Sequence, residues 1–345
     1  MVFNLEDEGL DLLQSIPGFQ NVKTGLYNER KRVLGAPKLR FKSCKEVTIP
    51  EKFKTFLLAE YEDDDRKILL FCSKKIVPLI KEGRYMHILG DGTFSSSPKG
   101  FKQLYTIHGV DEHTSNIIPL IYCLLPDKKF ETYTIVFRLI QSQFEDWKPE
   151  KITVDFELAP MKAIRKVFPS VVVKGCFYHL NRCLFRKAKF LKMTTRVKRR
   201  HVARCASLAR LPKEYIQTGK AYVMCKSPHG DDIKKFNEYF QKQWMKRTDF
   251  VRVCNCSEEK IRTTNNIEGW HSRLNRFVGR KNPTLAQLLE ILSKETKLFN
   301  IFKKQTKMSK EYQEIEAEIK QSIAQLNRNE ISVGHCIELI APFRF

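Results

Sequence analysis

A series of short apolar segments between residues 85 and 173 constrains the fold of this chain more than any other feature. The first three segments, 85–89, 101–110 and 116–125, follow one another closely. Each is rich in strand-forming residues, and a glycine turn or a proline closes the first and the third. Three strands in succession without an intervening helix predict an antiparallel meander.

Two helices and two further strands are predicted to follow the meander. A first helix precedes the strand 151–155, and a second one stops at Pro169 before a strand at 171–173. Helical spacing is visible in both apolar stripes. The stripes consist of Tyr133, Val136, Phe137, Ile140 and Phe144 in the first helix and of Met161, Ile164, Val167 and Phe168 in the second. The order β-β-β-α-β-α-β predicts an α/β fold with a mixed five-stranded sheet flanked by helices.

Beyond about residue 180 the apolar spacing becomes helical. Ile267, Trp270, Leu274 and Phe277 form a stripe that predicts the buried face of one helix. Two more helices are predicted over 284–302 and 310–326. Upstream of the meander, 56–58 and 68–71 predict strands on either side of an acidic turn.

Four regions are predicted from these patterns. Residues 1–84 form an N-terminal lead-in, and residues 85–180 form the α/β core. Residues 181–262 form a basic, all-helical insertion. Residues 263–345 contain the helix with Glu268 and a helical C-terminal extension.

The net charge of +23 on 345 residues is concentrated in one region. Residues 180–226 contain fourteen Lys or Arg and a single acid, Glu214, so this stretch carries +13 of the total. A charge run is often a solvated helix face, but here one acid leaves the bases without local ion-pair partners. We therefore expect contact with a polyanion, and DNA or RNA is the most common one.

Neither a secretion signal nor a membrane span is predicted. The first eight residues are acidic and lack the basic and apolar regions of a signal peptide. The longest apolar run, 117–125, contains a proline and is far shorter than the ~20 residues that span a bilayer. We expect a soluble intracellular protein without a membrane partner, whose ten cysteines are reduced.

Two local pairs, Cys176 with His179 and Cys254 with Cys256, provide four possible zinc ligands. The pairs lie some 75 residues apart, and the second has CxC rather than CxxC spacing. A structural zinc is therefore not the expected interpretation.

Three acids lie where predicted elements begin or end: Asp91, Asp155 and Glu268. Carboxylates that converge repel one another and attract a cation, and oxygen ligands suit Mg²⁺ or Mn²⁺. In a basic protein such a site indicates chemistry on nucleic-acid phosphates.

Each acid also has a structural alternative. Asp91 between two glycines fits a turn, and Asp155 fits a pair with Lys151 or a helix cap. Asn265 and Glu268 have the spacing of a capping box. Glu157 shares a strand face with Asp155 and competes with it for the metal-binding role.

Four motifs occur in a specific order: DGTF at 91–94, DFELA at 155–159, GCFYHL at 175–180 and NNIEGWH at 265–271. Their order, spacing and residues resemble the transposase domain of Mutator-like elements, the MULE domain. This domain belongs to the DDE/D transposases, whose core is ribonuclease H-like. The resemblance covers roughly residues 45–305.

The resemblance implies a metal-dependent DNA transposase that uses two Mg²⁺ or Mn²⁺ ions. Asp91 and Asp155 would hold the metal ions as the bridging pair, and Glu268 would complete the second ion's ligands. Cys176 and His179 match the CxxH of the family and imply support of the active site, as do Glu157 and His271. Trp270 is expected to be a core residue.

DNA contact and nuclear localisation are further expectations. The residues expected to bind DNA are Lys198, Arg199, Arg200, Arg204, Arg273, Arg276 and Arg280. The first cluster also resembles a nuclear import signal. Transposases of this kind assemble as multimers on DNA, so at least a homodimer is expected.

The chain departs from the family in its N-terminal region. The first 70 residues contain one cysteine, Cys44, and no histidine, so they cannot form a zinc-binding DNA-recognition module. This departure indicates a truncated or domesticated copy. The alternative function is thus a transposase-derived, nuclear DNA-binding or regulatory protein without catalysis.

Overall fold

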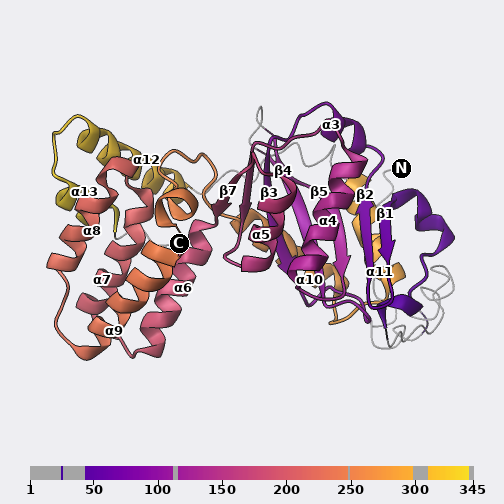
Figure 1. Cartoon of the computed structure of the whole chain (residues 1–345), viewed down its shortest axis with the longest axis horizontal. Helices are drawn as coiled ribbons and strands as arrows, with labels where there is room; N and C mark the ends of the chain where they lie inside the picture. The colour runs from indigo at the N-terminus through magenta and orange to yellow at the C-terminus, as the bar shows by residue number, and fades with distance from the viewer. Residues whose placement is uncertain (1–24, 26–42, 112–115, 248, 298–309, 342–345) are drawn as a thin grey trace, which may run out of the picture.

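The computed structural model describes Gly25 and residues 43–111, 116–247, 249–297 and 310–341. These residues form two lobes, one built on a β-sheet and one built from helices, which Figure 1 shows side by side. Most of the predicted lead-in before residue 43 lies outside the described residues, as does the predicted helical segment 298–302.

A single mixed sheet of seven strands forms the first lobe, in the order β1-β2-β5-β4-β3-β6-β7. Strands β3, β4 and β5 are the predicted antiparallel meander, and β6 and β7 run parallel to β3. The strands are β1 (Leu57–Glu62), β2 (Lys67–Cys72), β3 (His87–Thr93), β4 (Gln103–Val110), β5 (Ile117–Leu125), β6 (Lys151–Val154) and β7 (Val172–Gly175).

The sheet has two more strands than predicted. All five strands of the predicted core form in the predicted order, but the β1–β2 hairpin adds to the free edge of β5. The apolar run of β2 is buried on both faces, with Ile68 and Leu70 in one core and Leu69 and Phe71 in the other. This alternation follows from the two-residue repeat of a strand. The two strands were predicted from the sequence, while their place in the sheet was not.

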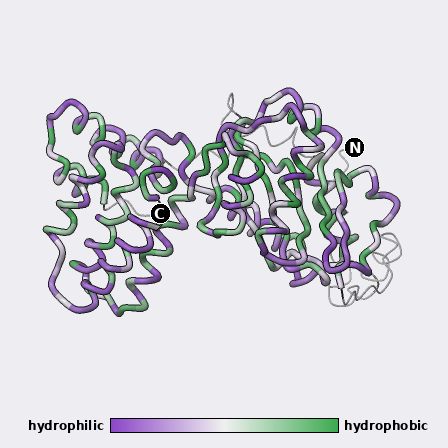
Figure 2. The backbone as a smooth tube through the Cα atoms, viewed as in Figure 1, coloured by the Kyte–Doolittle hydropathy of each residue, from purple (hydrophilic) through white to green (hydrophobic). Residues whose placement is uncertain are grey.

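Helices cover both faces of the sheet. Helices α3 (Val77–Lys81), α4 (Phe130–Gln143) and α5 (Leu158–Val167) contribute to one core. On the opposite face, α10 (Asn265–Val278) and α11 (Leu285–Lys297) pack together with the short helices η1 (Cys44–Glu46) and η2 (Glu51–Phe56). Figure 2 shows hydrophobic stretches within the sheet lobe.

The apolar stripe of α10 differs from the prediction at one position. Ile267, Trp270 and Leu274 are buried, but Phe277 is 66% exposed and Val278 is buried in its place. Eleven residues are slightly more than three full turns of 3.6 residues, so Val278 lies closer to the face of Ile267 than Phe277 does.

In the described part of the second lobe the regular elements are all helices. Its helices are α6 (Phe177–Phe190), α7 (Arg196–Ser207), η3 (Leu208–Arg210), η4 (Lys213–Tyr215), α8 (Ile216–Cys225), α9 (Asp231–Tyr239) and the π-helical η5 (Phe240–Arg247) and η6 (Phe250–Cys254).

The C-terminal helices pack onto the same hydrophobic core. They are α12 (Lys310–Asn327), which confirms the predicted helix, and α13 (Val333–Ile340), which was missed. The available signal for α13 was Ser332, whose side chain caps the helix by accepting a hydrogen bond from His335 N at 3.2 Å. No helix in the described part of the chain is long and apolar enough to cross a bilayer.

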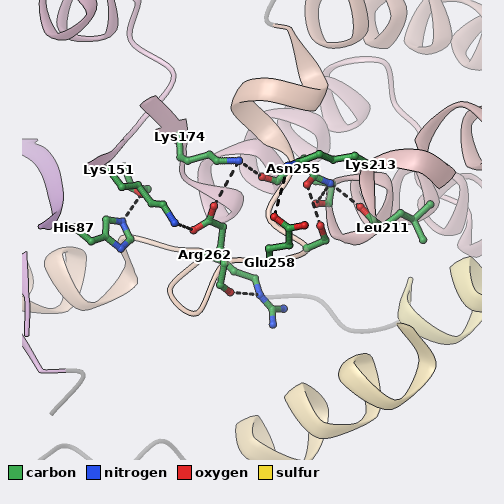
Figure 3. A network of polar contacts seen from close by, with 12 residues as sticks. His87, Lys151, Lys174, Leu211, Lys213, Asn255, Glu258 and Arg262 are labelled. Carbon is green, nitrogen blue, oxygen red and sulfur yellow. Dashed lines mark hydrogen bonds and ion pairs between the residues drawn. The ribbon is translucent and has the colours of Figure 1, made fainter. Parts of the chain in front are cut away.

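Polar contacts tie the two lobes together at the β6–β7 edge, as Figure 3 shows. Lys151 Nζ lies 2.5 Å from one oxygen of Glu259, and Lys174 Nζ lies 3.5 Å from the other. Lys174 also donates to the carbonyl of Asn255, whose side chain donates to the carbonyl of Leu211 in the helical lobe. These contacts hold the segment that leads from the helical lobe back to α10.

Candidate active site

Asp91 lies near the end of the central strand β3 and is buried. Its Oδ1 accepts a hydrogen bond from the Gly92 amide at 2.8 Å, and its Oδ2 lies 3.4 Å from His271 Nδ1. The alternative that Asp91 is a simple turn residue is therefore wrong. The carboxylate lies on the sheet face that α10 covers.

The glycines on both sides of Asp91 have a packing reason. A Cβ atom at Gly90 would lie 2.2 Å from the hydroxyl of Tyr105, and one at Gly92 would lie 3.0 Å from Gln103 Oε1. Both neighbours are buried side chains of β4. The glycines thus make room for two polar side chains beneath the strand that carries Asp91.

Asp155 follows the last residue of β6, beside Asp91. Strands β3 and β6 are parallel, and Gly90 pairs with Val154. The next residues, Asp91 and Asp155, therefore lie side by side toward the carboxyl ends of the two strands. Burial, and then the carboxylates of Glu157 and Asp91, raise the pKa of Asp155 to about 6. Burial is the largest cause of this shift, and the repulsion between neighbouring acids adds to it.

Neither structural alternative for Asp155 is formed. Lys151 pairs with Glu259, and the residue at the N-cap of α5 is Glu157, without a side-chain cap. Among the described residues, Asp155 has no cation within ion-pair distance. Its polar contact is a hydrogen bond from the Glu157 amide at 3.3 Å.

Glu157 lies at the rim of the site and forms an ion pair with Lys128. The Lys128 ammonium also lies 4.6 Å from the ring centre of Phe94, which is 48% exposed. Glu157 therefore contributes to the site by its charge and by its contact with Lys128.

Glu268 is contributed by the first turn of α10. Its Oε1 lies 3.3 Å from His179 Nε2 and 3.9 Å from an Arg182 nitrogen. The capping box is not formed, because Thr264 occupies the N-cap and Asn265 is already helical. Glu268 is thus directed to the start of α6.

His179 lies beside Glu268, whose carboxylate favours the charged form of the ring. Burial lowers the pKa of His179, but the Cys176 thiol and the Glu268 carboxylate outweigh this effect and raise the pKa to about 11. Its charge also reaches Asp155, whose pKa it lowers slightly against the larger opposing effects. In its charged form His179 therefore interacts with Glu268 and also with the acids on the sheet.

Cys176 joins the start of α6 to the segment before α10. Its Sγ accepts hydrogen bonds from the amide and the hydroxyl of Thr264, both at 3.2 Å. The Phe177 amide donates to the Arg262 carbonyl at 2.9 Å in the same junction. This geometry gives the CxxH motif a role in local structure, because it fixes where α10 begins and hence where Glu268 lies.

His271 packs against the sheet and is buried. Its Nε2 lies 3.1 Å from Thr106 Oγ1, which in turn lies 3.2 Å from His108 Nε2. Burial holds the pKa of His108 well below its usual range, so that ring is neutral. Trp270 is a core residue as expected, with its indole nitrogen 2.8 Å from Glu295 Oε1.

Several residues expected to bind DNA already have acidic partners. Lys198 lies 2.6 Å from Asp232, and Arg200 and Arg204 lie 2.6 and 2.7 Å from Glu338. The run supplies no acid to these three residues, but α9 and α13 do, so the absence of local partners did not leave these bases unpaired. Arg273 pairs with Glu295, whereas Arg199, Arg276 and Arg280 are exposed. The DNA contacts of all seven residues stay a prediction.

Arg182 is the residue near the site that sequence reasoning missed. Its side chain is 63% exposed and reaches Glu268. The available signal was its position three residues after His179, which places both on one face of a helix.

The side chains of the site determine which metal ions it suits. Asp91 and Asp155 supply oxygen donors of the kind that Mg²⁺ and Mn²⁺ prefer. Within residues 43–111, 116–247, 249–297 and 310–341, however, no group of three or more His, Cys, Asp or Glu is arranged to hold a metal ion. Cys176, His179, Cys254 and Cys256 do not form such a group either, and Glu268 contacts His179 instead.

Comparison with known families identifies one domain in the chain. No curated protein matches the chain. Residues 87–183 match the family model of the MULE transposase domain. The matched stretch runs from the start of β3 into α6, so it contains Asp91, Asp155 and the CxxH pair and ends before Glu268. Residues 87–183 of this chain are therefore a MULE transposase domain.

Proposed function

We propose that the chain is the catalytic part of a DNA transposase that cleaves and transfers DNA strands by two-metal-ion chemistry. One observation carries this proposal: Asp91 and Asp155 lie together at the ends of adjacent parallel strands, and their repulsion contributes to the raised pKa of Asp155. A transposase-type domain over the same residues supports it.

The topology of the sheet agrees with a ribonuclease H-like core. Three antiparallel strands are followed by two parallel ones, and the five lie in the order β5-β4-β3-β6-β7. Asp91 lies on β3, the middle strand of this set, and Asp155 directly follows β6, the strand that pairs with β3. The same core supports the assignment of Asp91 and Asp155 to one active site.

The chemistry of the donors suits a divalent ion at Asp91 and Asp155. Two carboxylates about 4 Å apart repel by roughly 4 kcal/mol at an effective dielectric near 20, and a cation removes that cost. Mg²⁺ or Mn²⁺ bound there would activate a water or a DNA 3′-hydroxyl and stabilise the leaving oxygen. His271 orients Asp91, and His179 holds Glu268 next to the same site.

A second candidate function is a transposase-derived DNA-binding or regulatory protein without catalysis. The contact of Glu268 with His179 and Arg182 favours it, because this carboxylate is occupied by cationic side chains. Both candidates bind DNA, and metal-dependent cleavage distinguishes them.

Plasmid nicking in Mg²⁺ or Mn²⁺ tests the proposal. We expect nicking by the native chain and its loss in Asp91→Ala, Asp155→Ala and Glu268→Ala. Asp231→Ala is the matched control, because this side chain is 88% exposed and lies on α9, outside the site. DNA binding without any metal-dependent cleavage would instead support the regulatory function.

A further inference from the structure

We propose that the exposed basic face of α6 binds the phosphate backbone of the DNA strand that is cut at the carboxylates. Three side chains form this α6 face: Arg182, Arg186 and Lys189. Its role rests on the proposed function, because it requires DNA at Asp91, Asp155 and Glu268.

The three cations share one side of the helix. They occupy positions i, i+4 and i+7, which lie along one stripe of an α-helix, and all three residues are exposed. At 1.5 Å per residue the stripe is about 10 Å long. One strand of a duplex advances about 3.4 Å per nucleotide, so this length corresponds to roughly three phosphates.

The α6 face begins at the candidate active site. His179 precedes Arg182 by one helical turn and lies 3.3 Å from Glu268, while Arg182 itself lies 3.9 Å from the same oxygen. From there α6 runs into the helical lobe, as Figure 1 shows. A strand with one phosphate at the acids would therefore meet the cations of α6 directly.

Two charges of this face, those of Arg186 and Lys189, are available for a ligand, while Arg182 also lies 3.9 Å from Glu268. Helix α6 contains four bases and no acid. In the part of the chain that the structure describes, no carboxylate pairs with Arg186 or Lys189. A row of exposed cations next to a metal-binding site complements the phosphates of DNA.

An exposed aromatic ring lies at the far end of the face. Phe190 is 77% exposed, and the Lys187 ammonium lies 5.1 Å from its ring centre. Cations that follow a backbone together with an exposed ring for base stacking are the features of a nucleic-acid strand surface. This combination favours DNA over an acidic protein as the occupant.

The salt dependence of DNA binding tests the α6 face. The triple variant Arg182→Gln, Arg186→Gln, Lys189→Gln is compared with the native chain by fluorescence anisotropy on a labelled 30-base-pair duplex in EDTA. We expect the log–log salt slope to become shallower by about 2 to 3, and the affinity to fall at least tenfold, because each lost phosphate contact removes roughly 0.9 from the slope.

Two further variants serve as controls. Lys213→Gln, Lys234→Gln, Lys294→Gln removes the same charge from exposed lysines on other elements and is expected to keep the native slope. Arg182→Lys, Arg186→Lys, Lys189→Arg keeps the charge of α6 and should restore DNA binding. Equal melting temperatures of all variants would show that folding is unaffected.

The outcome is independent of catalysis, because binding is measured without metal. A native slope in the α6 variant, or an equal loss in the charge control, overturns the role of the α6 face even if the native chain nicks plasmid. A selective loss of slope supports the α6 face even if nicking is absent and the proposed catalysis fails.

Discussion

Helices α6 and α7 are neighbours in the chain and both are strongly basic, yet their charges have different surroundings. On α7, Lys198, Arg200 and Arg204 are neutralised by Asp232 and Glu338, acids contributed by distant parts of the chain. On α6, the cations are exposed and begin beside Glu268. The comparison teaches that a basic run in a sequence contains both charges that are paired within the fold and charges that stay exposed, and that packing decides which are which.

The largest expected effect is a loss of nicking without a loss of DNA binding, which would show that the acids of the sheet and the bases of the helices have different roles. We expect Asp91→Asn to lower the metal-dependent nicking rate by at least about 100-fold, because a preorganised charge at the reacting centre is removed. Duplex affinity in EDTA should stay within about twofold, since α6 is untouched. If Asp91→Asn lowered DNA affinity as well as nicking, the result would indicate that DNA binds at the acids and not on α6.

The second expected effect follows from a substitution that leaves bases of α7 without an acidic partner, as on α6. Glu338→Gln leaves Arg200 and Arg204 without their carboxylate, and Arg204 is largely buried. We expect a loss of stability of about 2 kcal/mol in urea unfolding, because a buried charge loses its partner. The salt slope for DNA should steepen by up to about 2. Lost stability with an unchanged slope would show that α7 lies away from the DNA.

The third expected effect concerns the cost of holding the Asp155 carboxylate buried and close to Glu157 and Asp91. The folded-state pKa of Asp155, about 6, lies above its ordinary value of 3.8. The charged carboxylate therefore destabilises the fold above pH 6, and this cost disappears as the pH falls to about 4.

In EDTA at pH 7, Asp155→Asn should accordingly be more stable than the native chain by on the order of 2 kcal/mol. The difference should vanish at pH 4, which urea unfolding at both pH values would measure. Added Mg²⁺ should stabilise the native chain selectively. An equal response of both chains to Mg²⁺ would argue against a metal ion at Asp155.

The smallest expected effect is on stability and concerns the buried face of α10, the helix that carries Glu268. Val278→Ala should cost about 1 to 2 kcal/mol of stability, because it leaves a cavity in the core. Phe277→Ser should cost less than about 0.5 kcal/mol, because that ring is exposed. Chemical unfolding of both variants measures the difference, and the reverse order would place Phe277 in the core.

Much of the sheet lobe was predictable because its signals are local. Strand runs, helical stripes and their order determined the β-β-β-α-β-α-β core, and the DGTF and DFELA motifs marked Asp91 and Asp155. The place of the β1–β2 hairpin was not predictable, since pairing with β5 joins segments that are far apart in sequence. The boundaries of the four predicted regions stay a prediction.

The candidate site was predictable in its residue types but not in its contacts. Glu268 fits a capping box by spacing, yet Thr264 begins the helix and bonds to Cys176, which leaves Glu268 facing His179. Nothing in the local pattern of residues 265–271 specifies a partner on α6. Only packing of the two helices shows that the CxxH motif positions the third acid.

The sequence by itself determined the fold class, the MULE motifs and the excess of positive charge, because periodicity, residue order and composition are properties of the chain alone. Tertiary structure decided which acids meet and which bases remain exposed. The reason is that ion pairs and burial depend on residues brought together from distant segments, as Glu338 neutralises α7 while α6 keeps its exposed cations beside the acids.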